Sequence, residues 1–531
     1  MKLGNDLSVD SSAEAGSAGI SAALSEIDAL VRSGATAKAL DRCRQHARAN
    51  PDSLEINIAL GRLEQRHGSP EQAIGAFENA AQSAPNRVDV WVALGDARLA
   101  GGRFEAAAEA YRQALALSPD SPELKARLGA ALQSGGRVEE AAACYQAALK
   151  RSPQSALLHY NLGTALKALH RFDEAVTEYR EAVRLAPDNP ELKVRLGNLL
   201  VETSRFEQAI EPLSDALNAL PREAQGFVCH LLAYAHKKLG QGEGSVAAAE
   251  RLVALTGGAV AALMHLSAAY LTSGEPERAL EVCERGLRRE PASRQLLSDK
   301  ALALSALGRD EEASRLYDFD RLLKVSRINA PPGYDSVDQF NAALISHIRN
   351  HPTLDFSGIS LSCHQGATSD ELLVAPKGPV AELEQAIQRA AESFRAELAR
   401  EPAQPWKDNL PHHDSLELSA WVTRLRSQGY QHGHIHPSAW ISGVYYVSLP
   451  PEVRQKKDDA AGWIEFGRAP YYYAIDNENN IRTIRPEEGM LVLFPSYFYH
   501  RTIPFDSDNE RVTIAFDFRL PASQPSSIDG F

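Results

Sequence analysis

Small, aromatic and apolar residues recur over the first 325 residues of the chain with a fixed step of 34 residues. This step predicts one helical hairpin per period, because a small residue in each helix lets the pair approach closely and an aromatic side chain fills the next gap. Proline ends the second helix, since it cannot continue one. The positions that keep the step are the alanines Ala39, Ala73, Ala107, Ala141, Ala175 and Ala209, the glycines Gly61, Gly95, Gly129, Gly163 and Gly197, the aromatics Phe77, Tyr111, Tyr145 and Tyr179, and the prolines Pro51, Pro85, Pro119, Pro153, Pro187 and Pro221.

One period carries nearly the whole pattern of a known repeat. Its residues are Trp91, Leu94, Gly95, Ala107, Tyr111, Ala114 and Pro119. The array resembles tetratricopeptide repeats, which implies a right-handed superhelix. We expect about nine helical hairpins over residues 18–325, after a short disordered tail at residues 1–17. The period slips once after Pro221, and the segment HKKLGQGEGS is expected to hold two extra residues in a turn.

The first helix of each hairpin is expected to line a concave groove. Arg127, Asn161 and Arg195 stand two positions before successive motif glycines. Resemblance to peptide-binding arrays implies that these side chains point into the groove and hold an extended peptide by hydrogen bonds. The alternative is that they are ordinary solvated helix positions. We therefore expect a protein or peptide partner for the array.

The 34-residue register disappears from Asn329 onward. Two amphipathic helices are predicted first, at VDQFNAALISHIRNH and GPVAELEQAIQRAAESFRAELARE. Short strands rich in β-branched and aromatic residues follow, at LELSAWVTRL, WISGVYYVSL, GWIEFG, MLVLFP and RVTIAFDFRL. The predicted fold is therefore multidomain α + β, with an all-α superhelix followed, over residues 326–531, by a jelly-roll or barrel-like β domain with supporting helices.

Candidate chemistry is concentrated in this last segment. His432, His434 and His436 occupy alternate positions, so on a strand all three would face one side, an arrangement that favours a metal site. His500 follows the strand MLVLFP, and Arg511 lies 11 residues later with Thr513 on the same strand face. We expect Arg511 to lie near the same pocket as His500.

The segments HIHPSAWISGVYYVSLP, GWIEFG, EEGMLVLFPSYFYHRTIPF and ERVTIAFDF resemble the double-stranded β-helix of Fe(II)/2-oxoglutarate-dependent dioxygenases over roughly residues 330 to 525. The resemblance implies Fe(II), 2-oxoglutarate and O₂ as cofactors, with stimulation by ascorbate, and oxidation of the co-substrate to succinate coupled to hydroxylation. It implies His434, His436 and His500 as iron ligands and Arg511 as the partner of the 2-oxoglutarate carboxylate, assisted by Thr513.

Tyr445 and Tyr446 occupy successive strand positions, so only one of them faces the pocket. We take Tyr446 as the candidate to hydrogen-bond 2-oxoglutarate, beside the simpler interpretation of core packing.

The sequence departs from the family pattern at the first metal-binding element, which usually reads HxD or HxE. Every register here offers only histidine or Ser438 in the second position. His432 is therefore held as a reserve ligand, and Glu465 is a carboxylate that could complete the site. Two other interpretations stay open: a cupin-like metalloenzyme, and a non-catalytic tetratricopeptide scaffold with a degenerate oxygenase fold.

Composition narrows the choice of partners and compartment. Hydrophobic residues make up 44% of the 531 residues, and 56 Lys and Arg stand against 69 Asp and Glu, for a net charge of −13. An acidic chain repels phosphate backbones, so nucleic acid is not expected as a partner. No apolar run is long enough to cross a membrane. Five scattered cysteines without a CxxC motif suit a reducing compartment, and we expect a cytoplasmic protein.

Overall fold

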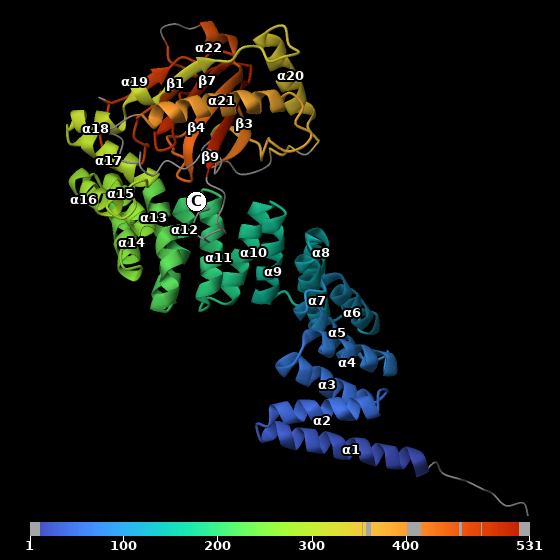
Figure 1. Ribbon diagram of the computed structural model, residues 1–531. Helices are drawn as coiled ribbons and strands as arrows, with labels where there is room; N and C mark the ends of the chain where they lie inside the picture. The colour runs from blue at the N-terminus through green and yellow to red at the C-terminus, as the bar shows by residue number, and fades with distance from the viewer. Residues whose placement is uncertain are drawn as a thin grey trace, which may run out of the picture. The chain divides into compact units, whose positions relative to one another are not determined.

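The computed structural model describes residues 11–352, 354–356, 363–400, 416–455, 459–478 and 480–519 (Figure 1). The side chains of residues 11–18 are outside this description. The chain divides into two compact units, Met1–Leu196 and Gly197–Phe531, and each is described by itself.

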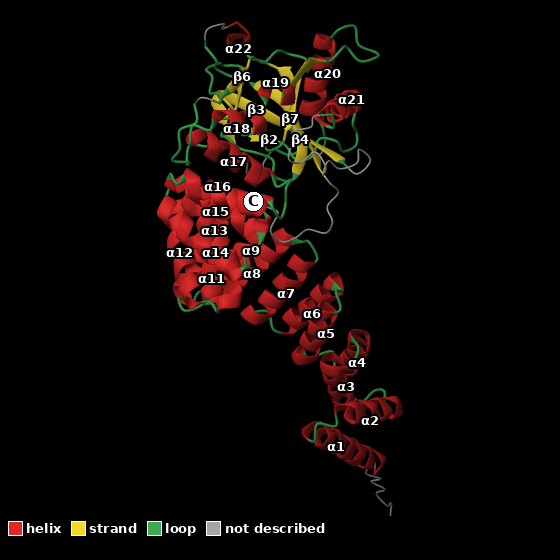
Figure 2. Ribbon diagram, turned by 60° about the vertical axis from the view of Figure 1, so that its left-hand side comes forward, coloured by secondary structure: helices red, strands yellow, loops and turns green. Residues whose placement is uncertain are grey.

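Consecutive helices in pairs form the described part of the first unit and the beginning of the second (Figure 2). They are α1 (Ser11–Arg32), α2 (Thr36–Ala49), α3 (Leu54–His67), α4 (Pro70–Ser83), α5 (Val88–Ala100), α6 (Phe104–Leu117), α7 (Pro122–Ser134), α8 (Val138–Leu149), α9 (Ala156–Ala168), α10 (Phe172–Leu185), α11 (Pro190–Glu202), α12 (Phe206–Ala219), α13 (Gln225–Lys238), α14 (Gly242–Leu255), α15 (Val260–Ser273), α16 (Pro276–Leu287), α17 (Arg294–Ala306) and α18 (Asp310–Leu316). The helical array expected from the 34-residue step is confirmed. Helix α1 begins at Ser11, so part of the segment expected as a tail is helical, and residues 1–10 lie outside the described residues.

Close packing between a glycine and an aromatic ring joins the two helices in four of the described pairs, from α3 and α4 to α9 and α10. Gly95 and Tyr111 are fully representative: a Cβ atom placed on Gly95 would lie 2.5 Å from the ring of Tyr111. The same approach recurs at Gly61 with Phe77. At Gly197, the last glycine of the series, the neighbour is Leu213. An aliphatic side chain there fills the space that a ring fills in the other pairs. The array therefore depends on the absence of a side chain at these positions.

The slip in the 34-residue step has a different location from the one expected. The turn at 239–241, within HKKLGQGEGS, has the same length as the turn at 203–205 between α11 and α12. The extra residues lie before and inside α13. A 3-10 turn, η1 (Arg222–Ala224), precedes this helix, and α13 has 14 residues where α9 and α11 have 13. The insertion was placed at the glycine-rich turn because glycine marks loops, but a short helix extension needs no such residue.

The β-rich region begins before residue 325, where the repeat array was expected to end. Its helices are α19 (Phe319–Leu322), α20 (Val337–Asn350), α21 (Val380–Leu398) and α22 (Pro451–Gln455). Its strands are β1 (Lys324–Arg327), β2 (Cys363–Thr368), β3 (Glu417–Gln431), β4 (Ala439–Ser448), β5 (Ile464–Phe466), β6 (Arg482–Ile484), β7 (Met490–Pro495), β8 (His500–Thr502) and β9 (Arg511–Arg519). The expected boundary between residues 325 and 326 falls within β1, which pairs with β7.

The strands form two antiparallel sheets. The larger has the order β1-β7-β4-β9-β3-β2, and the smaller has the order β6-β5-β8. Strand β9 lies between β3 and β4, so both of its edges are paired. Helix α21 crosses over the large sheet, as Figure 1 shows, and buries a stripe of apolar residues at helical spacing, from Val380 through Leu383 and Ile387 to Phe394.

The second unit includes both the last repeats and the β-rich region, and direct hydrogen bonds join them. The Tyr497 hydroxyl donates to the carbonyl of Leu316 at 2.6 Å, and the amide of Ala474 donates to the carbonyl of Leu271 at 3.0 Å. The buried carboxylate of Asp299 accepts from the hydroxyl of Tyr473 at 3.2 Å. The last repeats therefore help to form the fold around the β-rich region.

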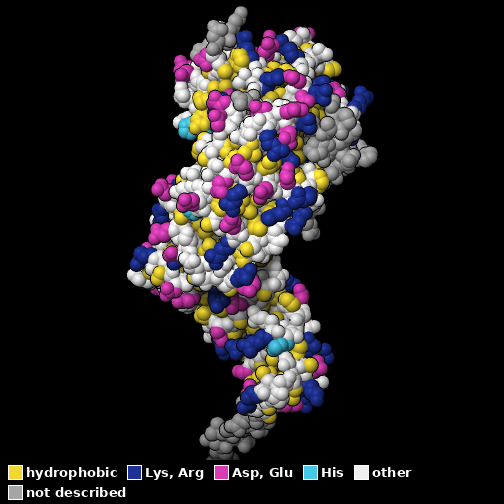
Figure 3. All heavy atoms as spheres, turned by 90° about the vertical axis from the view of Figure 1, so that its left-hand side faces the viewer, with side chains coloured by type: hydrophobic (Ala, Val, Ile, Leu, Met, Phe, Trp, Pro, Cys, Tyr) yellow, Lys and Arg dark blue, Asp and Glu magenta, His cyan; other side chains and the backbone are white. Residues whose placement is uncertain are grey.

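All five cysteines are free. Positive and negative side chains are intermixed over the face of the described residues drawn in Figure 3. A search of the described helices finds none that combines the length and the apolarity needed to cross a bilayer.

The glycine-ring contact leads to a matched pair of variants. G95A should lower the free energy of unfolding by about 1 to 3 kcal/mol, because the new methyl group overlaps the ring of Tyr111. G75A should raise it by about 0.5 to 1 kcal/mol, since Gly75 lies inside α4 with nothing within 4 Å of the added atom. Denaturant unfolding followed by the helical circular dichroism signal measures both. Equal effects of the two substitutions would contradict this view of the repeat core.

Candidate metal and ligand site

A backbone bridge brings the two parts of the histidine cluster together. The segment between β3 and β4 carries His434, and β8 begins at His500. Each of these residues donates its backbone N–H to the other's carbonyl, both at 3.1 Å. Residues far apart in the sequence therefore share one short antiparallel contact. Their side chains lie on the same side of it, with ring centroids 4.3 Å apart.

His436 completes a cluster of three imidazoles. Its ring centroid lies 5.2 Å from that of His434 and 5.2 Å from that of His500. One ligand atom from each of the three residues lies within 4.8 Å of the others. Among the described residues this is the single group of three or more potential metal ligands at such distances. The arrangement suits one divalent cation.

Each imidazole is oriented by an acceptor at its Nδ1 atom. Nδ1 of His434 lies 2.7 Å from the carbonyl oxygen of His432, and Nδ1 of His500 lies 3.0 Å from that of Phe498. Nδ1 of His436 lies 2.6 Å from Oδ1 of Asp517. Because each acceptor requires a proton on Nδ1, the Nε2 lone pairs are left for a metal.

Burial keeps two of the rings in the neutral form that binds metals. It lowers the pKa of His434 to about 3, and the neighbouring His436 adds to this shift. Burial also lowers the pKa of His500 well below its ordinary value, with His434 and His436 acting in the same direction. A charged imidazolium here would be desolvated beside other rings without compensation. The two side chains therefore need no deprotonation before a cation binds.

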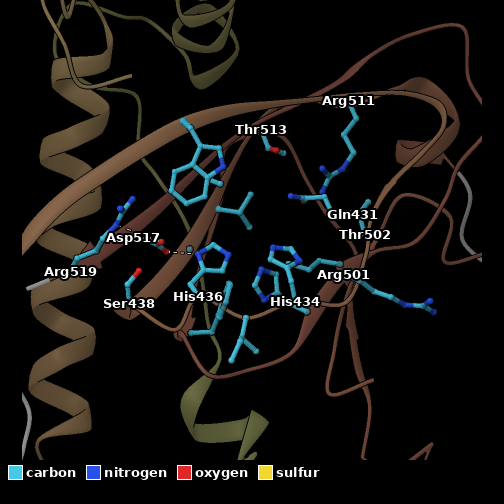
Figure 4. Close-up of a pocket in the computed structure, with 18 residues that line it drawn as sticks. Gln431, His434, His436, Ser438, Arg501, Thr502, Arg511, Thr513, Asp517 and Arg519 are labelled. Atoms are coloured by element: carbon cyan, nitrogen blue, oxygen red, sulfur yellow. Dashed lines mark hydrogen bonds and ion pairs between the residues drawn. The ribbon is translucent and has the colours of Figure 1, made fainter. Parts of the chain in front are cut away.

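The buried, positively charged side chain of Arg511 lines the same cavity as the three imidazoles. The cavity has a volume of about 300 Å³, and both Arg511 and Thr513 line it together with the three histidines (Figure 4). Arg511 is 2% exposed, and no carboxylate within the described residues forms an ion pair with it. Its Nε atom and the hydroxyl of Tyr446 are buried without a hydrogen-bond partner. Since unpaired buried cations are costly, this end of the cavity is suited to an anion.

Strand β9 supplies this face of the cavity by simple alternation. Its lining residues are Arg511, Thr513, Ala515, Asp517 and Arg519. The residues between them include Ile514, Phe516 and Phe518, which are buried in the core on the other face. One strand thus places Arg511 and Thr513 at one end of this face, and Asp517 with Arg519 at the other.

Sequence reasoning missed Asp517, the carboxylate nearest to the histidine cluster. Figure 4 shows its contact with His436, and it also accepts a hydrogen bond from the Ser442 hydroxyl at 2.7 Å. The signal that could have found it is the two-residue alternation along RVTIAFDFR, which continues from Arg511 and Thr513 to Asp517. Asp517 does not belong to the group of metal-ligand atoms; it holds one of them.

The reserve ligands lie elsewhere. The segment around His432 is not a regular strand, so the expectation that three histidines share one strand face is wrong. His432 packs its ring on Tyr471, with centroids 5.2 Å apart. Glu465 is buried, and its carboxylate accepts from Nε of both Arg468 and Arg501 at 2.6 Å. These two arginines, rather than a metal, satisfy Glu465.

The two tyrosines of β4 face opposite ways, as alternation requires. The Tyr445 hydroxyl donates to Oδ1 of Asn341 in α20 at 2.7 Å. Tyr446 lies opposite Thr513 in the strand pairing, and its ring centroid is 5.1 Å from the guanidinium carbon of Arg511. Tyr446 thus lies beneath Arg511 and is not itself a lining residue of the cavity.

The predicted groove residues are partly engaged within the first unit. Arg127 pairs with the carboxylate of Asp96, and Arg195 pairs with Glu191 at 2.8 Å. Both arginines remain about half exposed, at 46% and 52%. Asn161 is partly buried. Their role as groove residues stays a prediction.

Family models match three parts of the chain. Residues 419–517 match the model described as "Putative 2OG-Fe(II) oxygenase", and residues 230–294 match a tetratricopeptide repeat model. Residues 1–228 match the model of the C-terminal domain of cilia and flagella-associated protein 70. The chain therefore carries tetratricopeptide repeats and a C-terminal domain of this oxygenase family. A comparison with curated proteins gives no match.

Solved structures that resemble the chain cover part of it. MamA from Desulfovibrio magneticus RS-1 is 22% identical, with 31% of this chain and 94% of that chain covered and a TM-score of 0.30. Pseudomonas aeruginosa PilF is 20% identical, covering 39% and 93% with a TM-score of 0.33. YrrB, described as a TPR protein with an unusual peptide-binding site, is 16% identical, covering 35% and 96% with a TM-score of 0.30.

The contact between Asp517 and His436 can be tested by metal titration. D517N should weaken Mn²⁺ binding about 10- to 100-fold, because an amide oxygen orients and polarises the imidazole less well than a carboxylate. Electron paramagnetic resonance of the free ion measures the affinity. D508N is the matched control, since Asp508 is exposed on the loop before β9. Unchanged affinity in D517N would show that the carboxylate plays no part in the metal site.

Proposed function

We propose that this protein is an Fe(II)- and 2-oxoglutarate-dependent oxygenase that hydroxylates a protein or peptide substrate recruited by its tetratricopeptide repeats. The observation that carries the proposal is the presence, in one cavity, of three metal-binding imidazoles and a buried arginine without a carboxylate partner among the described residues. A structural metal site alone would not need that arginine. If Arg511 served only to form a structural ion pair, a carboxylate of the protein would lie beside it.

The histidine cluster fits Fe(II). Imidazole nitrogens suit ferrous iron, and three ligands on one face leave positions for a chelating co-substrate and O₂. His434, His436 and His500 would hold the ion through Nε2, because their Nδ1 atoms are occupied by acceptors. When bound, the iron and 2-oxoglutarate supply the oxidising chemistry that hydroxylates a C–H bond.

The arginine end of the cavity fits the distal carboxylate of 2-oxoglutarate. A guanidinium binds a carboxylate through two parallel hydrogen bonds, and the free Nε of Arg511 is available for one of them. The Thr513 hydroxyl lines the same cavity, and the unpartnered Tyr446 hydroxyl lies behind it. A volume of about 300 Å³ is at the lower end of small-ligand pockets, about 300 to 1,000 Å³, which suits a five-carbon diacid.

The position of Asp517 compensates for the missing carboxylate ligand. Three neutral imidazoles leave the charge of Fe(II) unneutralised, whereas the family usually places one carboxylate on the metal. Here the negative charge lies one hydrogen bond away, on the side chain that accepts from His436 at 2.6 Å. A carboxylate in this position raises the basicity of the ring nitrogen that faces the metal. We infer that Asp517 contributes much of the charge balance of the site.

The protein's own part in the reaction is binding, orientation and exclusion of water. Arg511 fixes one end of the co-substrate, so the other end is directed toward the histidine cluster. Apolar residues, among them Ile464, Val444 and Phe494, line part of the cavity beside its polar groups. Such a lining limits side reactions with water.

Recruitment of a polypeptide rests on the repeat array. Arrays of this kind present extended surfaces along successive helices, which suits an extended chain better than a metabolite. Arg127 and Arg195 are held by ion pairs yet remain half exposed, so they would offer preformed donors to a peptide.

A second candidate is a non-catalytic repeat scaffold that retains the metal site. The absence of a carboxylate among the three ligand residues favours it. That candidate predicts iron binding without any consumption of 2-oxoglutarate. A cupin-like enzyme would instead show activity that is independent of 2-oxoglutarate.

Succinate release tests the proposal directly. The protein with Fe(II), 2-oxoglutarate and O₂ should form succinate above background, and H500A should abolish it. R511A should raise the KM for 2-oxoglutarate by roughly 100-fold or more, because a buried charge pair that loses one partner costs about 3 to 5 kcal/mol. R482A is the matched control, since Arg482 lies in β6 and pairs with Asp320 outside the cavity. Succinate formation by the wild type equal to that of R511A would reject the enzymatic assignment.

A further inference from the structure

One face of α13 carries an unusual set of side chains. Phe227, His230, Tyr234, Lys237 and Lys238 are spaced so that they lie along one side of the helix, and we call them the α13 face. The buried residues of α13, such as Val228, Leu231 and Ala235, occupy the other side. Phe227 is 47% exposed, which is high for a large apolar side chain. Phe227 is the exposed residue of the α13 face, and His230, Tyr234, Lys237 and Lys238 are partly buried, so each of the five keeps some accessible surface.

Contacts along the α13 face hold its side chains in place. The ring of Phe227 stacks on His230 at 6.4 Å with an interplanar angle of 14°. Nδ1 of His230 lies 2.8 Å from Nε2 of His265 in α15. The ring of Tyr234 packs edge-on against Phe206. Ordered side chains lose little further freedom when they bind a partner.

The two lysines at the end of the α13 face lack anionic partners. Within the described part of the chain, neither Lys237 nor Lys238 forms an ion pair, whereas Lys300, Lys324 and Lys377 each pair with a glutamate. Their ammonium groups lie over aromatic rings instead. The Nζ atom of Lys238 is 4.7 Å from the ring centroid of Tyr472, and that of Lys237 is 5.1 Å from the centroid of Tyr234.

The one acid that acts on Lys237 is already satisfied by other groups. Asp299 acts on the pKa of Lys237 only through the electrostatic field of its carboxylate, which raises that pKa. Its carboxylate accepts from Ser267 at 2.6 Å, from Gln295 at 2.8 Å and from Tyr473 at 3.2 Å. Burial lowers the pKa of Lys238 to about 7, and the neighbouring Lys237 ammonium adds to this shift. A bound carboxylate would relieve both effects.

A short series of contacts leads from these lysines to the metal site. The Tyr471 hydroxyl donates to the carbonyl of Lys238 at 3.4 Å, and its ring packs on His432. The carbonyl of His432 in turn orients His434. The positive end of the α13 face is therefore its end nearest to the cavity.

We propose that the α13 face binds an extended, acidic segment of the polypeptide substrate, with Lys237 and Lys238 receiving a Glu or Asp side chain close to the residue that is oxidised. This inference rests on the proposed function, since it assigns the substrate class of the same enzyme. The acidic side chain is chosen because two clustered ammonium groups without internal partners are complementary to it.

The length of the α13 face selects a peptide over a small molecule. From Phe227 to Lys238 the helix advances 11 residues, or about 16 Å at 1.5 Å per residue. An extended chain covers that distance with about five residues at roughly 3.3 Å each. The substrate segment would therefore place an apolar or aromatic residue on Phe227 and an acidic residue about five positions away.

Peptide binding to the full-length protein tests this without turnover. The probe is a fluorescein-labelled peptide, Gly-Ser-Phe-Gly-Ser-Gly-Ser-Glu-Glu-Gly-Ser, with both ends blocked. Its partner carries Gln-Gln in place of Glu-Glu. Fluorescence anisotropy at pH 6.5 and low salt, without iron or 2-oxoglutarate, should give at least about tenfold tighter binding of the Glu-Glu peptide, which corresponds to roughly 1.4 kcal/mol. K237Q/K238Q should abolish this preference, and K237R/K238R should retain it.

Charge reversal separates recognition from misfolding. K237E/K238E should prefer a Lys-Lys version of the peptide, a gain that an unfolded protein cannot show. K150Q/K300Q carries the same change in net charge, at the end of α8 and in α17, and should keep the wild-type preference. Equal binding of the Glu-Glu and Gln-Gln peptides would overturn the inference, as would a preference that survives K237Q/K238Q. Tight binding of only a Gln-Gln peptide with a free C-terminus would also overturn it, because that result assigns the lysines to a terminal carboxylate.

Succinate release is measured separately, so loss of peptide preference with retained turnover rejects this inference alone.

Discussion

The pairing of β9 between β3 and β4 is the constraint on which the candidate site depends. Both edges of β9 are hydrogen-bonded, so its register is fixed and its side chains must alternate between core and cavity. Ile514, Phe516 and Phe518 anchor it on the core side. Given that anchoring, Arg511 and Asp517 have no freedom to leave the cavity. A slip of one residue would bury the charged side chains in the core and expose the aromatic ones.

The site places opposite charges where neither neutralises the other. Arg511 lies at one end of the β9 cavity face and Asp517 lies near the other, six residues along an alternating strand. Asp517 is committed to His436 and Ser442, while Arg511 has no carboxylate partner among the described residues. A buried cation of this kind costs stability in the empty protein. The proposed co-substrate would remove that cost, which couples binding of the anion to stability of the fold.

The last repeats belong to the same compact unit as the β-rich region, and this changes the view of the repeat array. Hydrogen bonds from Tyr473 and Tyr497 to Asp299 and Leu316 join repeat helices to the segments that surround the cavity. The α13 face lies in this same unit. A division into a binding array and a separate catalytic domain is therefore too simple, since some repeats serve as part of the frame of the site.

The sequence alone determined the features that depend on local spacing. The 34-residue step specified the paired helices, because Gly95 and its equivalents leave room for a large side chain of the neighbouring helix. Enrichment in β-branched and aromatic residues located β4, β7 and β9, and the family resemblance implied His434, His436, His500 and Arg511 as candidates. Tertiary structure decided what depends on partners distant in the chain. It placed His432 and Glu465 outside the cluster. His432 packs on the ring of Tyr471, and Glu465 accepts hydrogen bonds from two arginines. It also brought Asp517 to His436 across the sheet, a contact that no local pattern specifies, because strand pairing alone sets which residues meet.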